Sequence, residues 1–291
     1  MSLDQATADF SEVRPRLFGI AYRMLGSATD AEDVVQDAWV RWQSYDRAKV
    51  RDPAAFLATT TTRLAINASQ SAHSRRETYI GPWLPEPVDT AADPALGAET
   101  GAVLEIAVLA LLERLPPTER AAYVLREAFD YPYSEIAEIV EVSEPNARQL
   151  VSRARKHLES ERRATVTPEE QDRLLHAFID AAQEGDLERL EELFTTDIVS
   201  HTDGGGITGA SRTPLIGRER VAKVFAKVAD KFWVDTRIDR IEVNGQPAAL
   251  ITREGGLVAL LVLEAGPQGI HRLLWMMNPE KLSAVEGHIP G

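Results

Sequence analysis

The pattern of apolar residues changes near Thr165, and this change restricts the fold of the chain more than any other sequence feature. Before it, apolar residues recur at helical spacing over residues 1 to about 75 and again over 99–163, with a Pro-rich segment at 76–98 between them. After it, two amphipathic stretches precede short β-branched runs that are separated by Gly-containing turns. The chain therefore predicts a multidomain protein with two all-α domains, a linker, and an α+β domain over 165–291.

The absence of cysteine excludes several classes of protein at once. Disulfide scaffolds, iron–sulfur proteins, zinc sites with Cys ligands and thiol nucleophiles all need this residue. The first residues contain Asp4, Asp9 and Glu12 and no long apolar run, so we expect no signal peptide. No stretch approaches 18 uncharged apolar residues, so we expect no membrane span. These features predict a cytoplasmic protein without membrane association.

The net charge argues against nucleic-acid binding unless basic residues gather locally. The chain has 45 Asp and Glu residues against 32 Lys and Arg residues, a formal charge of −13. The segment Glu144–Arg163 is the local exception, with six basic and three acidic residues and a charge of +3. The basic residues are Arg148, Arg153, Arg155, Lys156, Arg162 and Arg163, and the acidic ones are Glu144, Glu159 and Glu161.

This basic segment follows a pattern typical of a helix-turn-helix motif. We expect a helix at Thr118–Phe129, a short helix at Tyr133–Val140, and a third helix from the N-cap Ser143 to about Leu158. Glu141 occupies a turn position where Gly is common, and an ordinary helical hairpin is the alternative interpretation. The side chains expected to face duplex DNA are Asn146, Arg148, Gln149, Ser152, Arg153 and Lys156.

Near the N-terminus, Thr29 and Glu32 fit a capping box that begins an amphipathic helix. Its apolar face predicts packing against the rest of the domain. The opposite face suits either solvent exposure or a partner protein, and it carries Asp33, Gln36, Asp37 and Val40.

The next predicted helix starts at Asp52-Pro53, with Asp52 as the N-cap and Pro53 at the first position. One face is polar but nearly uncharged until Arg75-Arg76. Hydroxyl and amide groups of this kind suit contacts with bases or with the sugar–phosphate backbone, and they equally suit plain exposure. The candidate DNA contacts on this helix are Arg63, Asn67, Gln70, Arg75 and Arg76.

Two of these segments resemble extracytoplasmic-function (ECF) RNA polymerase sigma factors. Residues 25–39, which include Asp30-Ala31-Glu32-Asp33-Val34-Val35-Gln36-Asp37-Ala38-Trp39, resemble region 2, and residues 134–155 resemble region 4. Three shorter stretches resemble the SigJ-type subgroup, whose members carry a C-terminal SnoaL-like extension. These stretches are Trp83-Leu84-Pro85-Glu86-Pro87, Asp203-Gly204-Gly205-Gly206 and Asn278-Pro279-Glu280-Lys281-Leu282.

The resemblance implies an alternative sigma factor that directs core RNA polymerase to promoters, not an enzyme. It implies that the Asp33/Gln36/Asp37/Val40 face binds the β′ clamp helices and that region 4 binds the β flap of the polymerase. The helix after Pro53 corresponds to the one that captures melted −10 bases, and the helix after Ser143 to the one that reads −35 duplex DNA. We expect no cofactor, no metal site and a monomer when the protein is free.

The resemblance also implies a regulatory role for the C-terminal domain. We expect the Asp203–Gly206 loop to touch the Trp83–Pro87 linker and so set the spacing of the two DNA-reading domains. The segment that contains Asn278, Pro279 and Lys281 is a further candidate for regulation or for polymerase contact.

The pattern after Thr165 matches a SnoaL or ketosteroid-isomerase-like cone, an α+β fold with a curved antiparallel sheet around a pocket. We expect helices at 171–183, 187–194 and 217–232 and strands at 197–202, 236–243, 248–254, 257–264 and 269–276. The alternative function is a small-molecule-binding or isomerase-like protein with a helical DNA-binding fusion. An isomerase site commonly needs a tyrosine, and none follows Tyr133. The remaining acid–base candidates are Asp197, His201, Asp203 and His271, while a ligand-sensing pocket or a domain that only packs are further alternatives.

Overall fold

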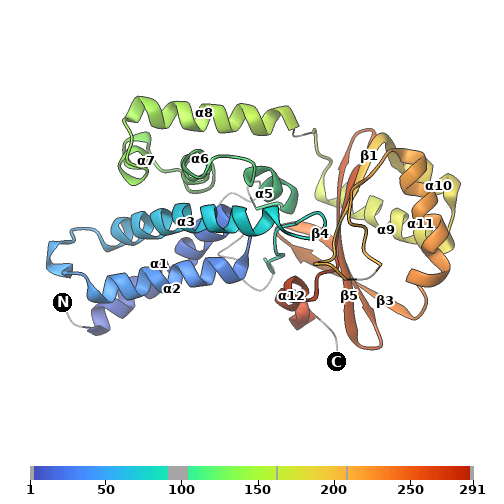
Figure 1. Cartoon of the computed structure of the whole chain (residues 1–291), viewed down its shortest axis with the longest axis horizontal. Helices are drawn as coiled ribbons and strands as arrows, with labels where there is room; N and C mark the ends of the chain where they lie inside the picture. The colour runs from blue at the N-terminus through green and yellow to red at the C-terminus, as the bar shows by residue number, and fades with distance from the viewer. Residues whose placement is uncertain (1–2, 91–103, 162, 208, 289–291) are drawn as a thin grey trace. The chain divides into compact units, whose positions relative to one another are not determined.

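The computed structural model describes residues 3–90, 104–161, 163–207 and 209–288, which belong to two compact units (Figure 1). The first, the helical unit, comprises Met1–Thr78 and Ala92–Arg162. The second, the sheet domain, comprises Tyr79–Ala91 and Arg163–Gly291. Residues 79–90 therefore pack with the sheet domain, although they directly follow the first helices in sequence.

The helical unit contains α-helices joined by short turns. α1 spans Leu3–Leu25, α2 Ala28–Ser44, α3 Pro53–Glu77, α5 Ile106–Leu112, α6 Pro117–Phe129, α7 Tyr133–Ile139 and α8 Glu144–Glu161, with a 3-10 turn, η1, at Arg47–Lys49. α1 packs against α2 and α3, and α6 packs against α8 and also against α1 and α3. The segments predicted as two all-α domains therefore share one compact unit.

The helix starts show which local predictions hold. Asp52 caps α3 by accepting a hydrogen bond from the Ala55 amide, with Pro53 at the first position, as predicted. The capping box at Thr29 is wrong: α2 begins earlier, and the Ser27 hydroxyl accepts from the Asp30 amide at 3.1 Å. Ser27 has the extended backbone that an N-cap needs, whereas Thr29 already lies within the helix.

The predicted helix-turn-helix geometry is present in α7 and α8. Glu141, in the turn, adopts a φ of 59°, the left-handed region that favours glycine. α8 begins immediately after Ser143. Its inward side chains are buried as predicted from their spacing, and they are Ala147, Val151, Ala154 and Leu158.

The sheet domain combines helices with one six-stranded sheet. α9 spans Pro168–Glu184, α10 Leu187–Leu193, α11 Arg218–Phe232 and α12 Pro279–Leu282, with η3 at Ser283–His288. The strands are β1 Phe194–Asp203, β2 Leu215–Ile216, β3 Thr236–Val243, β4 Gln246–Arg253, β5 Gly256–Gly266 and β6 Gly269–Met276. Their order in the sheet is β2-β1-β6-β5-β4-β3.

The sheet is mixed, which corrects the expectation of an antiparallel one. β1 pairs with β6 in parallel, with Ser200 opposite Leu273, while β3 to β6 form an antiparallel meander. A parallel neighbour requires a long crossover, and here the chain passes through β2, α11, β3, β4 and β5 before it returns beside β1. Local strand signals carry no information about this long-range pairing.

Aromatic side chains fill the space between the sheet and its helices. α9, α10 and α11 lie on one side of the sheet (Figure 1). Neighbouring ring centroids lie 4.8–6.2 Å apart, in edge, tilted and stacked arrangements that stabilise a core. The rings belong to Phe178, Phe194, Phe225, Phe232, Trp233 and Trp275. Within the described residues, no helix of either unit is long and apolar enough to cross a membrane.

Candidate regulatory cluster and promoter-binding surfaces

The end of β1 carries a fully buried carboxylate, Asp203. It accepts hydrogen bonds from the Leu84 amide at 2.8 Å, from Lys281 Nζ at 2.7 Å, and from the Tyr79 hydroxyl. The Asn278 side-chain amide donates to the same Tyr79 hydroxyl at 2.9 Å. We call Tyr79, Leu84, Asp203, Asn278 and Lys281 the Asp203 cluster. It joins the three motifs that the sequence singles out.

Lys281 is the counter-charge of Asp203, and its side chain is 7% exposed. Its ammonium group also donates to the Leu84 carbonyl and lies 4.3 Å from the centre of the Trp83 ring. A buried ion pair is stable only when its remaining hydrogen-bonding groups are satisfied, as they are here. Burial and the neighbouring Asp203 carboxylate raise the pKa of Tyr79 well above its ordinary value, so Tyr79 stays a hydroxyl donor.

The glycines after Asp203 allow the loop to close on Asn278. Gly205 has a φ of 57°, and a Cβ there would lie 2.7 Å from Asn278 Cγ. A Cβ on Gly204 would lie 2.3 Å from the Ala210 Cβ, and Gly206 packs against Ile80. The glycine run is therefore required by close approach as well as by backbone conformation.

Further along the same segment, residues 88–90 pair with the end of β3 and the β3–β4 turn. The Val88 amide donates to Asn244 Oδ1, and the Asn244 amide donates to the Val88 carbonyl, both at 3.0 Å. The Thr90 hydroxyl donates to Glu242 at 2.9 Å. Pro85 and Pro87 are buried, Glu86 is half-buried, and Pro279 starts α12. Asn244 and Tyr79 were not predicted, and the only sequence signal for Tyr79 is its place just before Trp83.

On α3, the arginines predicted to contact −10 DNA are engaged within the helical unit. Arg63 donates to the Glu138 and Ile139 carbonyls at 2.8 and 2.9 Å and pairs with Glu141 at 3.1 Å. Arg75 pairs with Asp30 at 2.7 Å. Arg76 donates to the Leu25 carbonyl and pairs with Glu113. Asn67 and Gln70 are exposed.

Glu113 and Arg120 form a buried network that the sequence does not reveal. Arg120 donates to Glu113 at 2.7 Å and to the Met24 carbonyl, so it joins α6 to the end of α1. Burial lowers the pKa of Arg120 to about 10. With Arg76, this network ties the segments that resemble regions 2 and 4 to each other.

On α8, all six side chains predicted to contact −35 DNA are exposed. Arg148 pairs with Glu144 at 2.6 Å and lies over the Tyr133 ring, and Arg153 pairs with Glu119 at 3.0 Å. Both arginines are therefore held in ion pairs within the helical unit.

On α2, Asp33, Gln36 and Asp37 are exposed, and the Val40 beside them is 55% exposed. The structure thus places the four predicted residues together on one face of α2.

The four acid–base candidates of the sheet domain do not all line one common pocket. Asp203 belongs to the buried cluster, whereas Asp197 forms a bidentate ion pair with Arg163 on the surface. His271 lines a surface cavity of about 530 Å3 with Arg163, Thr195 and Asp197. His201 lies on β1 and is half-buried.

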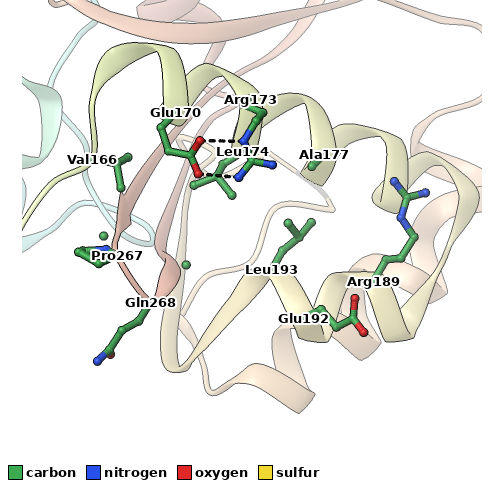
Figure 2. Close-up of a pocket in the computed structure, with 12 residues that line it drawn as sticks. Val166, Glu170, Arg173, Leu174, Ala177, Arg189, Glu192, Leu193, Pro267 and Gln268 are labelled. Carbon is green, nitrogen blue, oxygen red and sulfur yellow. Dashed lines mark hydrogen bonds and ion pairs between the residues drawn. The ribbon is translucent and has the colours of Figure 1, made fainter.

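A second surface cavity, of about 440 Å3, lies between α9, α10 and the β5–β6 turn. Figure 2 shows its apolar side chains, including Leu174 and Leu193, beside the paired Glu170 and Arg173. Both cavities lie outside the aromatic core of the domain.

Comparisons with known proteins support the resemblance of the two helical segments to sigma-70 regions 2 and 4. Residues 10–75 match the family model for sigma-70 region 2, and residues 105–158 match that for sigma-70 region 4. The chain is 35% identical over 231 residues to the ECF RNA polymerase sigma factor SigJ of Mycobacterium tuberculosis, covering 77% of this chain and 73% of that protein. It is 30% identical to the probable ECF sigma factor SigI of the same species, over 99% of this chain and 98% of that one. The crystal structure of M. tuberculosis SigJ superposes with a TM-score of 0.76 at 29% identity, over 96% of this chain and 98% of that one.

Proposed function

The chain belongs to the extracytoplasmic-function RNA polymerase sigma factors, non-enzymatic initiation factors that bind core polymerase and promoter DNA, and we propose that its SnoaL-like sheet domain regulates this function in cis. The Asp203 cluster is the observation that carries the proposal. It holds a segment that begins at Tyr79, two residues after the end of α3 at Glu77. The sheet domain therefore holds the segment that immediately follows α3, the helix assigned to the −10 element.

We further propose the finer assignments that the family resemblance implies. Asp33, Gln36, Asp37 and Val40 bind the β′ clamp helices, α3 captures −10 bases, and α8 reads the −35 duplex while its domain contacts the β flap. Arg148→Ala tests the −35 assignment, and the expected loss of duplex affinity is about 1–3 kcal/mol. Arg155→Ala is the matched control, because Arg155 is also exposed on α8 and paired, with Glu127, but was not assigned to DNA. Equal losses for both variants would contradict the assignment.

We also infer that the helical unit represents a closed state of the free protein. Arg63 and Arg76 of α3 are bound to the α7 end and to Glu113, so they are not available to DNA. The −10 and −35 elements are separated along the duplex by ~3.4 Å per base pair, which amounts to tens of ångströms. A unit in which α3 packs on α6 and α7 does not span that distance, so promoter binding requires these contacts to open.

The regulatory proposal is tested by run-off transcription with purified core polymerase and the full-length protein. Asp203→Asn keeps the size of the side chain but removes the counter-charge of Lys281, and we expect the transcript yield from a cognate promoter to change. Asp230→Asn, at an exposed position on α11, makes the same charge change and is expected to leave the yield unaltered. Equal yields for the Asp203→Asn variant and the wild type would contradict regulation through the cluster. A small ligand of the sheet domain and a monomeric free state stay predictions.

A further inference from the structure

We propose that the Arg163–Asp197 ion pair is a second attachment of the sheet domain, and that it restricts which spacings between the −10 and −35 elements this sigma factor accepts. The proposal rests on the cis-regulatory function proposed above. It assigns a specificity-determining role to two residues that lie outside the three sequence motifs.

The pair fixes the segment that leads into the sheet domain. Arg163 Nη1 lies 3.0 Å from Asp197 Oδ1, and Nη2 donates to Oδ2, so the contact is bidentate. The Thr195 hydroxyl also donates to Asp197 at 3.0 Å. Three residues further on, the Val166 amide donates to the Ala265 carbonyl at 3.2 Å, and Val166 packs against the core. The chain is therefore held from Arg163 onward.

The role that we propose for this ion pair follows from its position in the chain. Arg163 follows the last residue of α8, Glu161, by two positions, just as Tyr79 follows the last residue of α3, Glu77, by two positions. Two residues reach at most about 7 Å. One domain thus holds the chain directly behind both promoter-reading helices, and the two attachments together limit where the ends of these helices can lie.

Such a limit acts on spacer length. Each added base pair moves the −35 element by ~3.4 Å and rotates it by about 35° relative to the −10 element. A sigma factor held at Tyr79 and at Arg163 accepts a narrow range of spacers. When the ion pair is open, the chain behind α8 is first held at Val166, five residues after Glu161, and the longer link accepts a wider range. Asp203 and Lys281 are buried, whereas the side chains of Arg163 and Asp197 are 45% and 62% exposed, so the attachment behind α8 is the one that can be released.

The test is run-off transcription by full-length protein and core polymerase on promoters whose spacer changes one base pair at a time. We expect Arg163→Ala and Asp197→Ala to raise transcription from off-optimum spacers relative to the optimum by up to about fivefold, the factor that corresponds to an exposed ion pair. The exchange variant, Arg163→Asp with Asp197→Arg, is expected to restore the narrow range.

A matched control is Glu184→Ala, which removes the Arg189–Glu184 ion pair of the same domain, whose side chains are 44% and 61% exposed. It is expected to leave the spacer profile unchanged. An unaltered profile in both the Arg163→Ala and the Asp197→Ala variants would overturn the proposal, as would an equal change in the control. If Asp203→Asn changes the yield while Arg163→Ala leaves the profile unaltered, regulation in cis stands and the spacing role fails.

Discussion

The sheet domain holds the chain at two places, and the two attachments differ in their contact with water. Asp203 and Lys281 are buried, and the carboxylate accepts hydrogen bonds from Tyr79 and Leu84, which are remote in sequence. Arg163 and Asp197 form an equally direct ion pair, but both side chains are largely solvated. The chemistry of the two pairs is similar, so burial is what distinguishes them.

This difference separates a structural attachment from an exchangeable one. A buried charge that loses its partner remains in a low-dielectric environment, which is strongly unfavourable. An exposed charge that loses its partner regains water and salt ions, so little free energy is lost. We therefore expect the segment behind α3 to stay on the sheet domain while the segment behind α8 attaches and detaches.

The largest expected effect is that of Asp203→Asn on stability. The substitution leaves the Lys281 ammonium buried without a counter-charge, and the expected loss in the free energy of unfolding is about 3–5 kcal/mol. Urea unfolding of the full-length protein measures the loss, and hydrogen exchange at the Leu84 amide reports whether the segment detaches. Asp230→Asn is the control, with an expected change within about 0.5 kcal/mol. A loss no larger than the control's would contradict the view that burial makes this attachment permanent.

The next effect concerns the loop that closes the cluster. We expect Gly205→Ala to cost about 1–3 kcal/mol, because it combines a left-handed backbone with a Cβ 2.7 Å from Asn278. Gly255→Ala is matched, since Gly255 also has a positive φ but a Cβ added there would meet no atom within 4 Å. Urea unfolding of both variants isolates the steric part. Equal losses would mean that the loop does not need to close on Asn278.

Local signals in the sequence predicted much of this fold. Asp52 and Pro53 begin α3, the spacing of Ala147 to Leu158 gives the buried face of α8, and β3 and β6 match their predicted ends. These features depend on neighbouring residues and on periodicity. The cap at Thr29 failed because Ser27, two residues earlier, offers an equivalent hydroxyl.

Local sequence patterns did not predict the long-range pairings. The parallel β1–β6 pair joins strands separated by most of the domain, and the Tyr79–Asp203 and Arg76–Glu113 contacts join residues without a shared local pattern. The motif resemblance predicted contact between the Asp203–Gly206 loop and the Trp83–Pro87 linker, which the Leu84–Asp203 hydrogen bond forms, but it gave no partners for Asn278 or Lys281. Only the fold shows that Lys281 is the counter-charge of Asp203 and that Arg63 contacts the α7 end.

Acidification is expected to act on the exposed attachment through His271. Burial, followed by repulsion from Arg163 and Arg272, lowers the pKa of His271 to about 4, while Asp197 acts in the opposite direction and Glu264 lies 3.7 Å away. The unfolded chain binds this proton near pH 6.5, so the stabilising effect of a neutral His271 is complete above about pH 6.5 and is lost as the pH falls towards about 4.

We expect the thermal midpoint of the wild type to fall over that pH range and the fall to be smaller in His271→Gln. His176→Gln, at an exposed position on α9, is the control and should keep the wild-type slope. Identical slopes for all three proteins would contradict the assignment of this proton uptake to His271.

The smallest expected effect is that of Arg163→Ala on stability, and it tests the same comparison at the exposed attachment. An exposed pair contributes about 0.2–1 kcal/mol, so urea unfolding should show a loss no greater than this. The Debye length falls from ~10 Å at 0.1 M salt to ~3 Å at 1 M, so the coupling between Arg163 and Asp197 in a double-mutant cycle should shrink with added salt. The same cycle on Arg189 and Glu184 supplies the reference for an exposed pair. A loss near that of Asp203→Asn, or a coupling insensitive to salt, would mean that this attachment is as permanent as the buried one, and spacer selection would then not depend on its release.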